Sequence, residues 1–124
     1  MNFNNSIQEA SKNVKGFSTN EETILVVDDS RQLVNFLADS ILASLGYRSM
    51  KAFNGKTALN IIRNHQSEIC LMLLDLEMPD MTGLELLRKA RAAGYDVPAI
   101  MITARGSEQI AVDAFRLGVH DYLT

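Results

Sequence analysis

Five short apolar runs alternate with four segments of helical periodicity, and this alternation constrains the fold of the chain more than any other feature. The runs are TILVV (23–27), YRSMKAF (47–53), ICLMLL (69–74), PAIMIT (98–103) and VHDYLT (119–124). Most of them lack polar–apolar alternation, as expected for parallel strands that are covered on both faces. Crossovers between parallel strands are right-handed almost without exception. We therefore predict an α/β domain with a doubly wound, five-stranded parallel sheet.

The segments between the runs have the periodicity of amphipathic helices, and they span residues 30–46, 54–65, 82–94 and 107–118. In the first of them one helical face carries four apolar residues, Leu33, Leu37, Ile41 and Leu45. This spacing is typical of the apolar face of an amphipathic helix. Gly46 is the predicted end of this helix, because glycine is common just past a helix C-terminus.

Residues 1–22 differ from the remainder in composition, because they are rich in Asn, Ser, Lys and Glu. We interpret them as a polar lead-in to a domain of residues 23–124. Four apolar residues of this lead-in have helical spacing, Ile7, Ala10, Val14 and Phe17. A short helix is therefore one interpretation and a flexible segment is the other.

Charge and cysteine content narrow the class of protein. The formal net charge of −3 and the pI of about 5.3 give no reason to propose nucleic-acid binding by this domain. No apolar run approaches the ~20 residues that span a bilayer, and the N-terminus lacks the profile of a secretion signal. Cys70, the single cysteine, lies inside an apolar run, so we expect a core residue and no disulfide. We expect a soluble, cytoplasmic protein with no membrane contact.

Acidic and hydroxyl side chains follow the predicted strands at the points where the strands end. Asp28 and Asp29 follow the first strand, Asp75 follows the third, and Thr103 ends the fourth. If the strand order is 2-1-3-4-5, which periodicity alone does not prove, these residues meet at one edge of the sheet. Carboxylates about 5 Å apart repel by roughly 1 kcal/mol or more per pair, which a divalent cation relieves. All-oxygen ligands favour Mg²⁺, and a phosphoryl group accepted by an aspartate suits such a site.

Four motifs together resemble the receiver domain of bacterial two-component response regulators: Asp28-Asp29, DLEMPDMTG from Asp75, ITA at 102–104 and the terminal DYLT. The resemblance covers residues 23–124 in order, and the motifs are specific only in combination. It implies the flavodoxin-like fold of the chemotaxis regulators with strand order 2-1-3-4-5. It also implies a signalling switch in a phosphorelay rather than a turnover enzyme.

The resemblance assigns a phosphoacceptor and a magnesium site. Asp75 would accept a phosphoryl group from a phosphohistidine of a histidine kinase or of a histidine phosphotransfer protein. Asp29 would bind Mg²⁺ directly and Asp28 mostly through water. The backbone carbonyl of Glu77 would complete the protein ligands of the ion.

The resemblance also assigns a switch. Thr103 would hydrogen-bond a phosphoryl oxygen, and the small Ala104 would leave room for it. Tyr122 would turn inward as Thr103 moves, although plain packing is the alternative interpretation of this residue. Glu77 and Arg105 have opposite charges, and we expect them to form an ion pair over the phosphoryl site that slows hydrolysis.

The chain departs from the family pattern at its end. The family has a lysine just after the position of Thr124, then a proline and a fifth helix packed beside the first, and this sequence ends before them. We expect the fifth helix to be missing, which would leave an apolar patch on one sheet face that favours a homodimer or aggregation.

Other functions remain open at this point. The absent lysine is compatible with a pseudo-receiver, a binding module that never accepts phosphate. An aspartyl phosphatase would carry a second Asp where this chain has Glu77. A flavin carrier would need a phosphate-binding loop where this chain has the acidic DDSRQ. Asp28, Asp29 and Ser30 taken alone could be helix N-caps.

Overall fold

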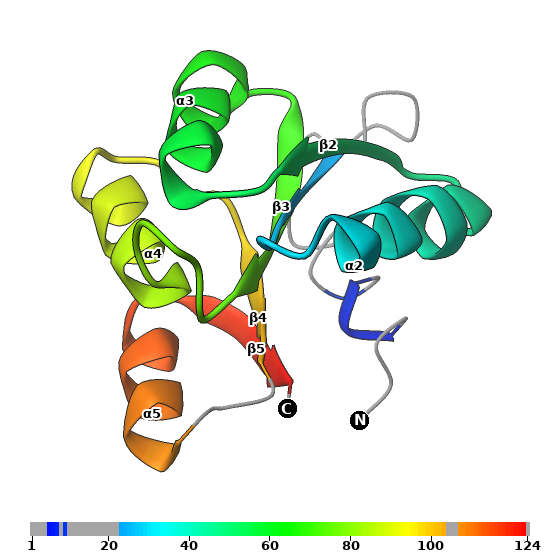
Figure 1. Ribbon diagram of the computed structural model, residues 1–124. Helices are drawn as coiled ribbons and strands as arrows, with labels where there is room; N and C mark the ends of the chain where they lie inside the picture. The colour runs from blue at the N-terminus through cyan, green and yellow to red at the C-terminus, as the bar shows by residue number, and fades with distance from the viewer. Residues whose placement is uncertain (1–4, 8, 10–22, 104–106, 124) are drawn as a thin grey trace.

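Five parallel strands form one sheet in the computed structural model, which describes residues 5–7, 9, 23–103 and 107–123. The strands are β1 (Thr23–Val27), β2 (Arg48–Ala52), β3 (Ile69–Asp75), β4 (Ala99–Ile102) and β5 (Val119–Leu123). Their order is β2-β1-β3-β4-β5, and every neighbouring pair is parallel (Figure 1). The predicted fold class and strand order are confirmed. Every residue of β1 is buried, because helices or other chain segments cover both faces of the sheet.

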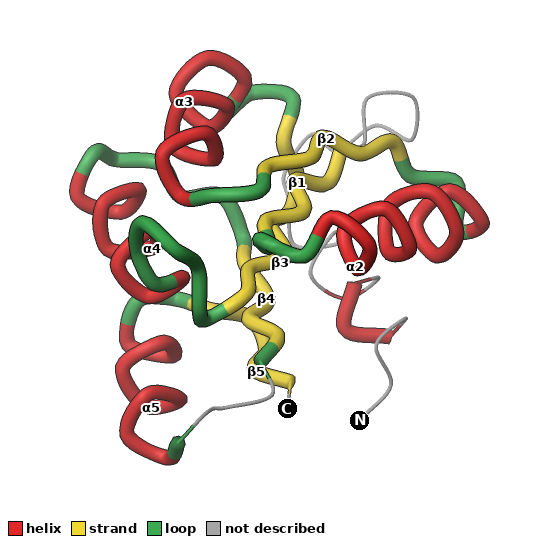
Figure 2. The backbone as a smooth tube through the Cα atoms, viewed as in Figure 1, coloured by secondary structure: helices red, strands yellow, loops and turns green. Residues whose placement is uncertain are grey.

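Helices cover the sheet from two sides. On one side lie α3 (Gly55–His65), α4 (Gly83–Ala92) and α5 (Glu108–Arg116) (Figure 2). On the other side lies α2 (Arg31–Asn35), which continues as the π-helical stretch η1 (Phe36–Leu42). The apolar core is accordingly divided into two clusters, one on each face of the sheet. No helix among the described residues is both long and apolar enough to cross a bilayer.

Polar residues and glycines set the ends of the helices. Side-chain oxygens accept hydrogen bonds from the first-turn N–H groups of α2, α3, α4 and α5, and they belong to Ser30, Asn54, Thr82 and Ser107. Such caps satisfy N–H groups that have no partner within the helix. The predicted stop at Gly46 is confirmed, because this residue adopts a positive φ of 86° after η1.

The apolar face predicted for the first helix is partly buried. Leu37 packs against the apolar cluster on this side of the sheet, whereas Leu33 is 39% exposed. The buried positions of this helix are Val34, Ala38 and Leu42. Both sets of residues repeat every four positions, so spacing alone could not choose between them. Val34 and Leu42 belong to the apolar cluster on this face of the sheet, and Ala38 between them is also buried.

Part of the N-terminal lead-in lies on the α2 side of the sheet. Residues 5–7 and Glu9 are helical, and both Ser6 and Ile7 are buried. Ile7 belongs to the apolar cluster of that face, and Leu123 of β5 packs against the same cluster. Ala10, Val14 and Phe17 lie outside the described residues. The described chain ends in β5, and the sheet face that we expected to be open is covered in part by Ile7.

Candidate functional site

Three carboxylates meet at the C-terminal edge of the sheet. Asp28 and Asp29 follow β1, and Asp75 is the last residue of β3. These strands are neighbours, with Val27 paired to Leu74, so the two strand ends lie side by side. Ligand oxygens of the three side chains lie within 4.8 Å of one another. The structure thus brings the predicted acidic residues together at the edge where α/β sheets bind ligands.

The carboxylates are held in an unfavourable electrostatic setting. Burial raises the pKa of Asp75 to about 6, with further contributions from the charges of Asp28 and Asp29, against the opposing effect of the Glu77 and Leu76 N–H groups. Burial also raises the pKa of Asp28, and the charge of Asp29 adds to the rise. A cation bound among these groups would relieve their repulsion.

Local hydrogen bonds fix the loop after β1. The N–H of Ser30 donates to Asp28 Oδ1 at 2.9 Å, and the N–H of Asp28 donates to the carbonyl of Ala52 at 3.2 Å. Ser30 Oγ accepts from the N–H of Leu33 and is the N-cap of α2. The helix-cap interpretation therefore holds for Ser30, while Asp28 belongs to the carboxylate cluster.

Asp80 ties the loop after β3 to the start of α3. Its two carboxylate oxygens accept hydrogen bonds from the N–H groups of Gly55 and Lys56, both at 2.9 Å. These bonds hold the pKa of Asp80 below its usual value. No role for Asp80 was predicted from the sequence. An acidic residue inside a Met-Pro turn was the available signal, but its partners lie on another helix and only the fold reveals them.

Gly83 closes the same loop against the phosphoacceptor candidate. Its N–H donates to the carbonyl of Leu76 at 2.8 Å. A Cβ atom at this position would lie 2.2 Å from the backbone oxygen of Asp75. Only glycine fits such an approach without moving the backbone. Gly83 was part of the quoted motif, but its packing role was not predicted.

Thr103 follows β4, the neighbour of β3, and Tyr122 lies in β5, the next strand of the sheet. Asp75 pairs with Ile102, so Thr103 follows directly beside it, and Thr103 is buried. Its N–H donates to the carbonyl of Leu123 at 2.9 Å. Tyr122 packs on the α3–α5 side, and its buried Oη has no hydrogen-bond partner among the described residues. Glu77 is exposed. Ala104 and Arg105 lie outside the described residues, as does the expected Glu77–Arg105 pair.

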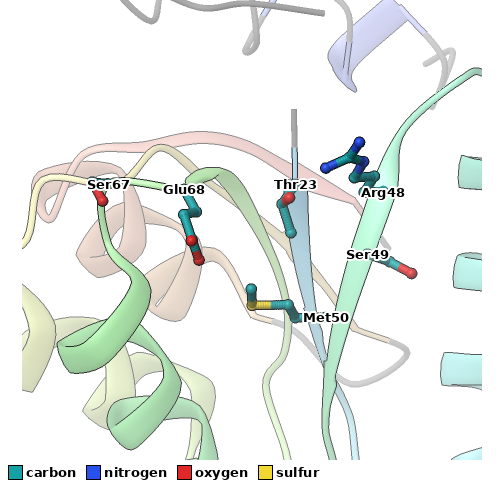
Figure 3. Close-up of a pocket in the computed structure, with 6 residues that line it drawn as sticks. All are labelled: Thr23, Arg48, Ser49, Met50, Ser67 and Glu68. Carbon is teal, nitrogen blue, oxygen red and sulfur yellow. The ribbon is translucent and has the colours of Figure 1, made fainter. Parts of the chain in front are cut away.

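A hollow of about 530 Å³ opens at the opposite edge of the sheet. Figure 3 shows the residues that line it, which come from the starts of β1 and β2 and from the turn before β3: Thr23, Arg48, Ser49, Met50, Ser67 and Glu68. A five-residue strand rises about 3.3 Å per residue, so β1 separates this hollow from the carboxylates by roughly 15 Å. It is therefore not part of the acidic site.

Comparison with known families agrees with the fold and the acidic edge. Residues 24–124 match the family model of the response regulator receiver domain. The chain belongs to this family. Receiver domains are signalling domains of two-component response regulators, which histidine kinases phosphorylate. They generally bind Mg²⁺ at acidic residues, and the all-oxygen cluster of this receiver domain fits such an ion.

The receiver domain is similar in sequence to bacterial response regulators and in structure to solved receiver domains. It is 39% identical over 100 residues to the transcriptional regulatory protein CpxR of Escherichia coli. The aligned residues are 81% of this chain and 41% of that protein. A response regulator receiver protein from Pseudomonas putida is 32% identical with a TM-score of 0.76, and 82% of this chain and 84% of that one are covered. A chain of the CheX-CheY-BeF3-Mg complex from Borrelia burgdorferi is 31% identical with a TM-score of 0.77, covering 82% and 76%. The receiver domain thus spans about two fifths of the curated CpxR relatives.

Proposed function

We propose that Asp75 is the phosphoacceptor of this receiver domain and that it takes its phosphoryl group from a phosphohistidine. The donor would be a histidine kinase or a histidine phosphotransfer protein. The observation that carries the proposal is the convergence of Asp28, Asp29 and Asp75 within 4.8 Å. Asp75 is the member of this cluster that ends the central strand β3 and lies beside Thr103.

The transfer is a substitution at phosphorus. An Oδ atom of Asp75 forms the new O–P bond while the P–N bond to the donor imidazole breaks, and the imidazole nitrogen takes up a proton. The attacking carboxylate must be ionised, and with a pKa of about 6 Asp75 is mostly ionised at neutral pH. Asp28, Asp29, Asp75 and the Glu77 carbonyl would hold Mg²⁺, which supplies positive charge against the phosphoryl oxygens.

Thr103 and Tyr122 are the residues through which we expect the signal to leave the site. The Thr103 hydroxyl would bond a phosphoryl oxygen, and its N–H already joins β4 to Leu123 of β5. The Tyr122 Oη is buried without a partner among the described residues, which costs free energy and favours a rearrangement that gives it one.

Intact mass after incubation with a small acyl-phosphate donor and Mg²⁺ tests the proposal. We expect one phosphoryl adduct on the native protein, none on Asp75→Asn, and none when the metal is chelated. Asp113→Asn, a change on α5, is the matched control and should retain the adduct. A folded native protein that forms no adduct would contradict the proposal and support a phosphorylation-independent binding module.

A further inference from the structure

Residues 5–7 and Glu9, here called the N-terminal strap, lie on the α2 side of the sheet next to β5 (Figure 1). Ile7 is fully buried. It belongs to the apolar cluster that contains Leu73 of β3 and Ile100 of β4. The strap therefore contributes to the core of the receiver domain although its sequence is polar.

Two polar contacts join the strap to β5. Ser6 Oγ donates a hydrogen bond to Asp121 Oδ2 at 2.5 Å, across 115 residues of sequence. The second carboxylate oxygen of Asp121 accepts from the N–H of Tyr122 at 2.9 Å. Glu9 Oε2 lies 3.8 Å from His120 Nε2, a weaker contact because Glu9 is largely exposed. Two residues of the edge strand, His120 and Asp121, thus contact the strap, and Tyr122 is bonded to Asp121.

The same strand reaches the phosphorylation site. The carbonyl of Leu123 accepts the N–H of Thr103 at 2.9 Å, and the Leu123 side chain packs against the cluster that contains Ile7. Successive residues of a strand point to opposite faces, so Asp121 and Leu123 belong to the strap side and Tyr122 to the α3–α5 side. One strand therefore connects the strap on one face with Thr103 and Tyr122.

The described part of the strap buries little apolar surface. Ile7 is its only apolar residue, and Glu9 is largely exposed. A segment that buries one apolar side chain opens more easily than the sheet that it covers. A hydrogen bond weakens steeply with distance, so a displacement of β5 on the order of 1 Å would weaken the bond from Ser6 to Asp121.

We propose that the N-terminal strap is a detachable regulatory element whose docking on β5 is coupled to phosphorylation of Asp75. This proposal rests on the proposed function. When Thr103 moves toward the phosphoryl group, the Leu123 carbonyl bonded to it follows, and β5 withdraws Asp121 from Ser6. Phosphorylation therefore weakens strap docking. By reciprocity, a loosened strap strengthens binding at the phosphoryl site.

Thermal unfolding of the unphosphorylated protein tests whether the strap is docked. Loss of a buried Ile side chain and the resulting cavity should lower the Tm of Ile7→Ala by about 10 °C. Val112→Ala, at an exposed position on α5, is the matched control and should change Tm by no more than about 3 °C. Equal Tm values for Ile7→Ala and this control would overturn docking. If Ile7→Ala does not fold, Ser6→Ala replaces it. Ser6→Ala should lower the Tm of the protein that has Asp121, because the bond between the two residues is lost. It should leave the Tm unchanged in a protein in which Asp121 is already replaced by alanine.

Beryllofluoride with Mg²⁺ tests the coupling, since it binds reversibly as a phosphoryl mimic and reciprocity then applies. We expect faster amide exchange at Ser6 and Ile7 when it is bound, and roughly 5-fold tighter binding by Ile7→Ala than by Val112→Ala. The coupling would be overturned if beryllofluoride binds the native protein without changing amide exchange at Ser6 and Ile7, and if Ile7→Ala and Val112→Ala bind it equally well. This result would leave the proposed function and the docking of the strap intact. A native protein that binds no beryllofluoride and accepts no phosphoryl group would overturn the proposed function and the coupling, while the Tm comparison still decides docking.

Discussion

At the scale of single residues, the acidic site is a set of charges assembled at a cost to stability. Burial and the neighbouring carboxylates raise the pKa of Asp75 to about 6 from its ordinary value of 3.8. Asp80 shows the opposite case, because two backbone N–H groups lower its pKa. The raised pKa of Asp75 fits its proposed role in binding a ligand, whereas the lowered pKa of Asp80 reflects the hydrogen bonds that hold the loop.

The pH dependence of stability should distinguish these two aspartates. The folded protein keeps a proton on Asp75 up to about pH 6, whereas the unfolded chain releases it near 3.8, so raising the pH through this window destabilises the fold. We expect Asp75→Asn to raise Tm at pH 7.5 in the absence of metal, with a gain that shrinks as the pH falls from 6 toward 4. Asp80→Asn should lower Tm at pH 7.5. A gain for Asp75→Asn that does not depend on pH would contradict this assignment of the cause.

Metal should stabilise the native site and not the substituted one. We expect Tm to rise when Mg²⁺ is added at pH 7.5, because binding to the folded state alone shifts the unfolding equilibrium. The rise should be much smaller in Asp75→Asn, since one of the three clustered carboxylates is then neutral. Equal shifts in the two proteins, measured by thermal unfolding over a magnesium titration, would show that the ion binds elsewhere.

At the scale of elements, the loop between β3 and α4 is fixed from two directions. Asp80 attaches it to the N-terminus of α3, and Gly83 packs it against the backbone of Asp75. Both contacts restrain the loop that follows Asp75 and carries Glu77. Such support would pre-organise the acidic edge for the proposed metal and phosphoryl group.

Gly83→Ala should test this rigidity. The new Cβ would meet backbone atoms of Asp75, which cannot move without shifting the site, so we expect a loss of about 1–3 kcal/mol in unfolding free energy and slower phosphorylation. Gly46→Ala is the matched control. Its φ of 86° makes this substitution strained as well, but the new Cβ would meet nothing within 4 Å, so phosphorylation should be retained. Denaturant unfolding and adduct formation rates measure the two effects, and equal rates in both variants would argue against a positioning role for Gly83.

At the scale of the whole molecule, the sequence was sufficient to predict the strands and helices of the domain and the acidic residues at the sheet edge. Apolar runs that end in Asp28 and Asp75 locate both strand ends, because a carboxylate cannot continue a buried strand without a partner. Strand order was not contained in periodicity and came from the family resemblance. Spacing indicated the helical face of Leu33 and Leu37, whereas Val34 and Leu42 are the fully buried residues, because both sets repeat every four positions.

Contacts between distant segments were beyond sequence reasoning. The bond from Ser6 to Asp121 joins residues 115 apart, and neither residue belongs to a pattern that indicates the other. The bonds from Gly55 and Lys56 to Asp80 are of the same kind. Such pairs depend on how the elements pack in space, which local propensity does not specify.

The central claim is that Asp75 carries the phosphoryl group, and reductive trapping tests it most directly. Native protein is incubated with an acyl-phosphate donor and Mg²⁺ and then treated with borohydride, which reduces an aspartyl phosphate to a stable alcohol. Peptide mass spectrometry then locates the altered residue. We predict the alteration at Asp75, with Asp28 and Asp29 intact. An alteration at Asp28, Asp29 or another residue, or none in folded protein, would contradict the account.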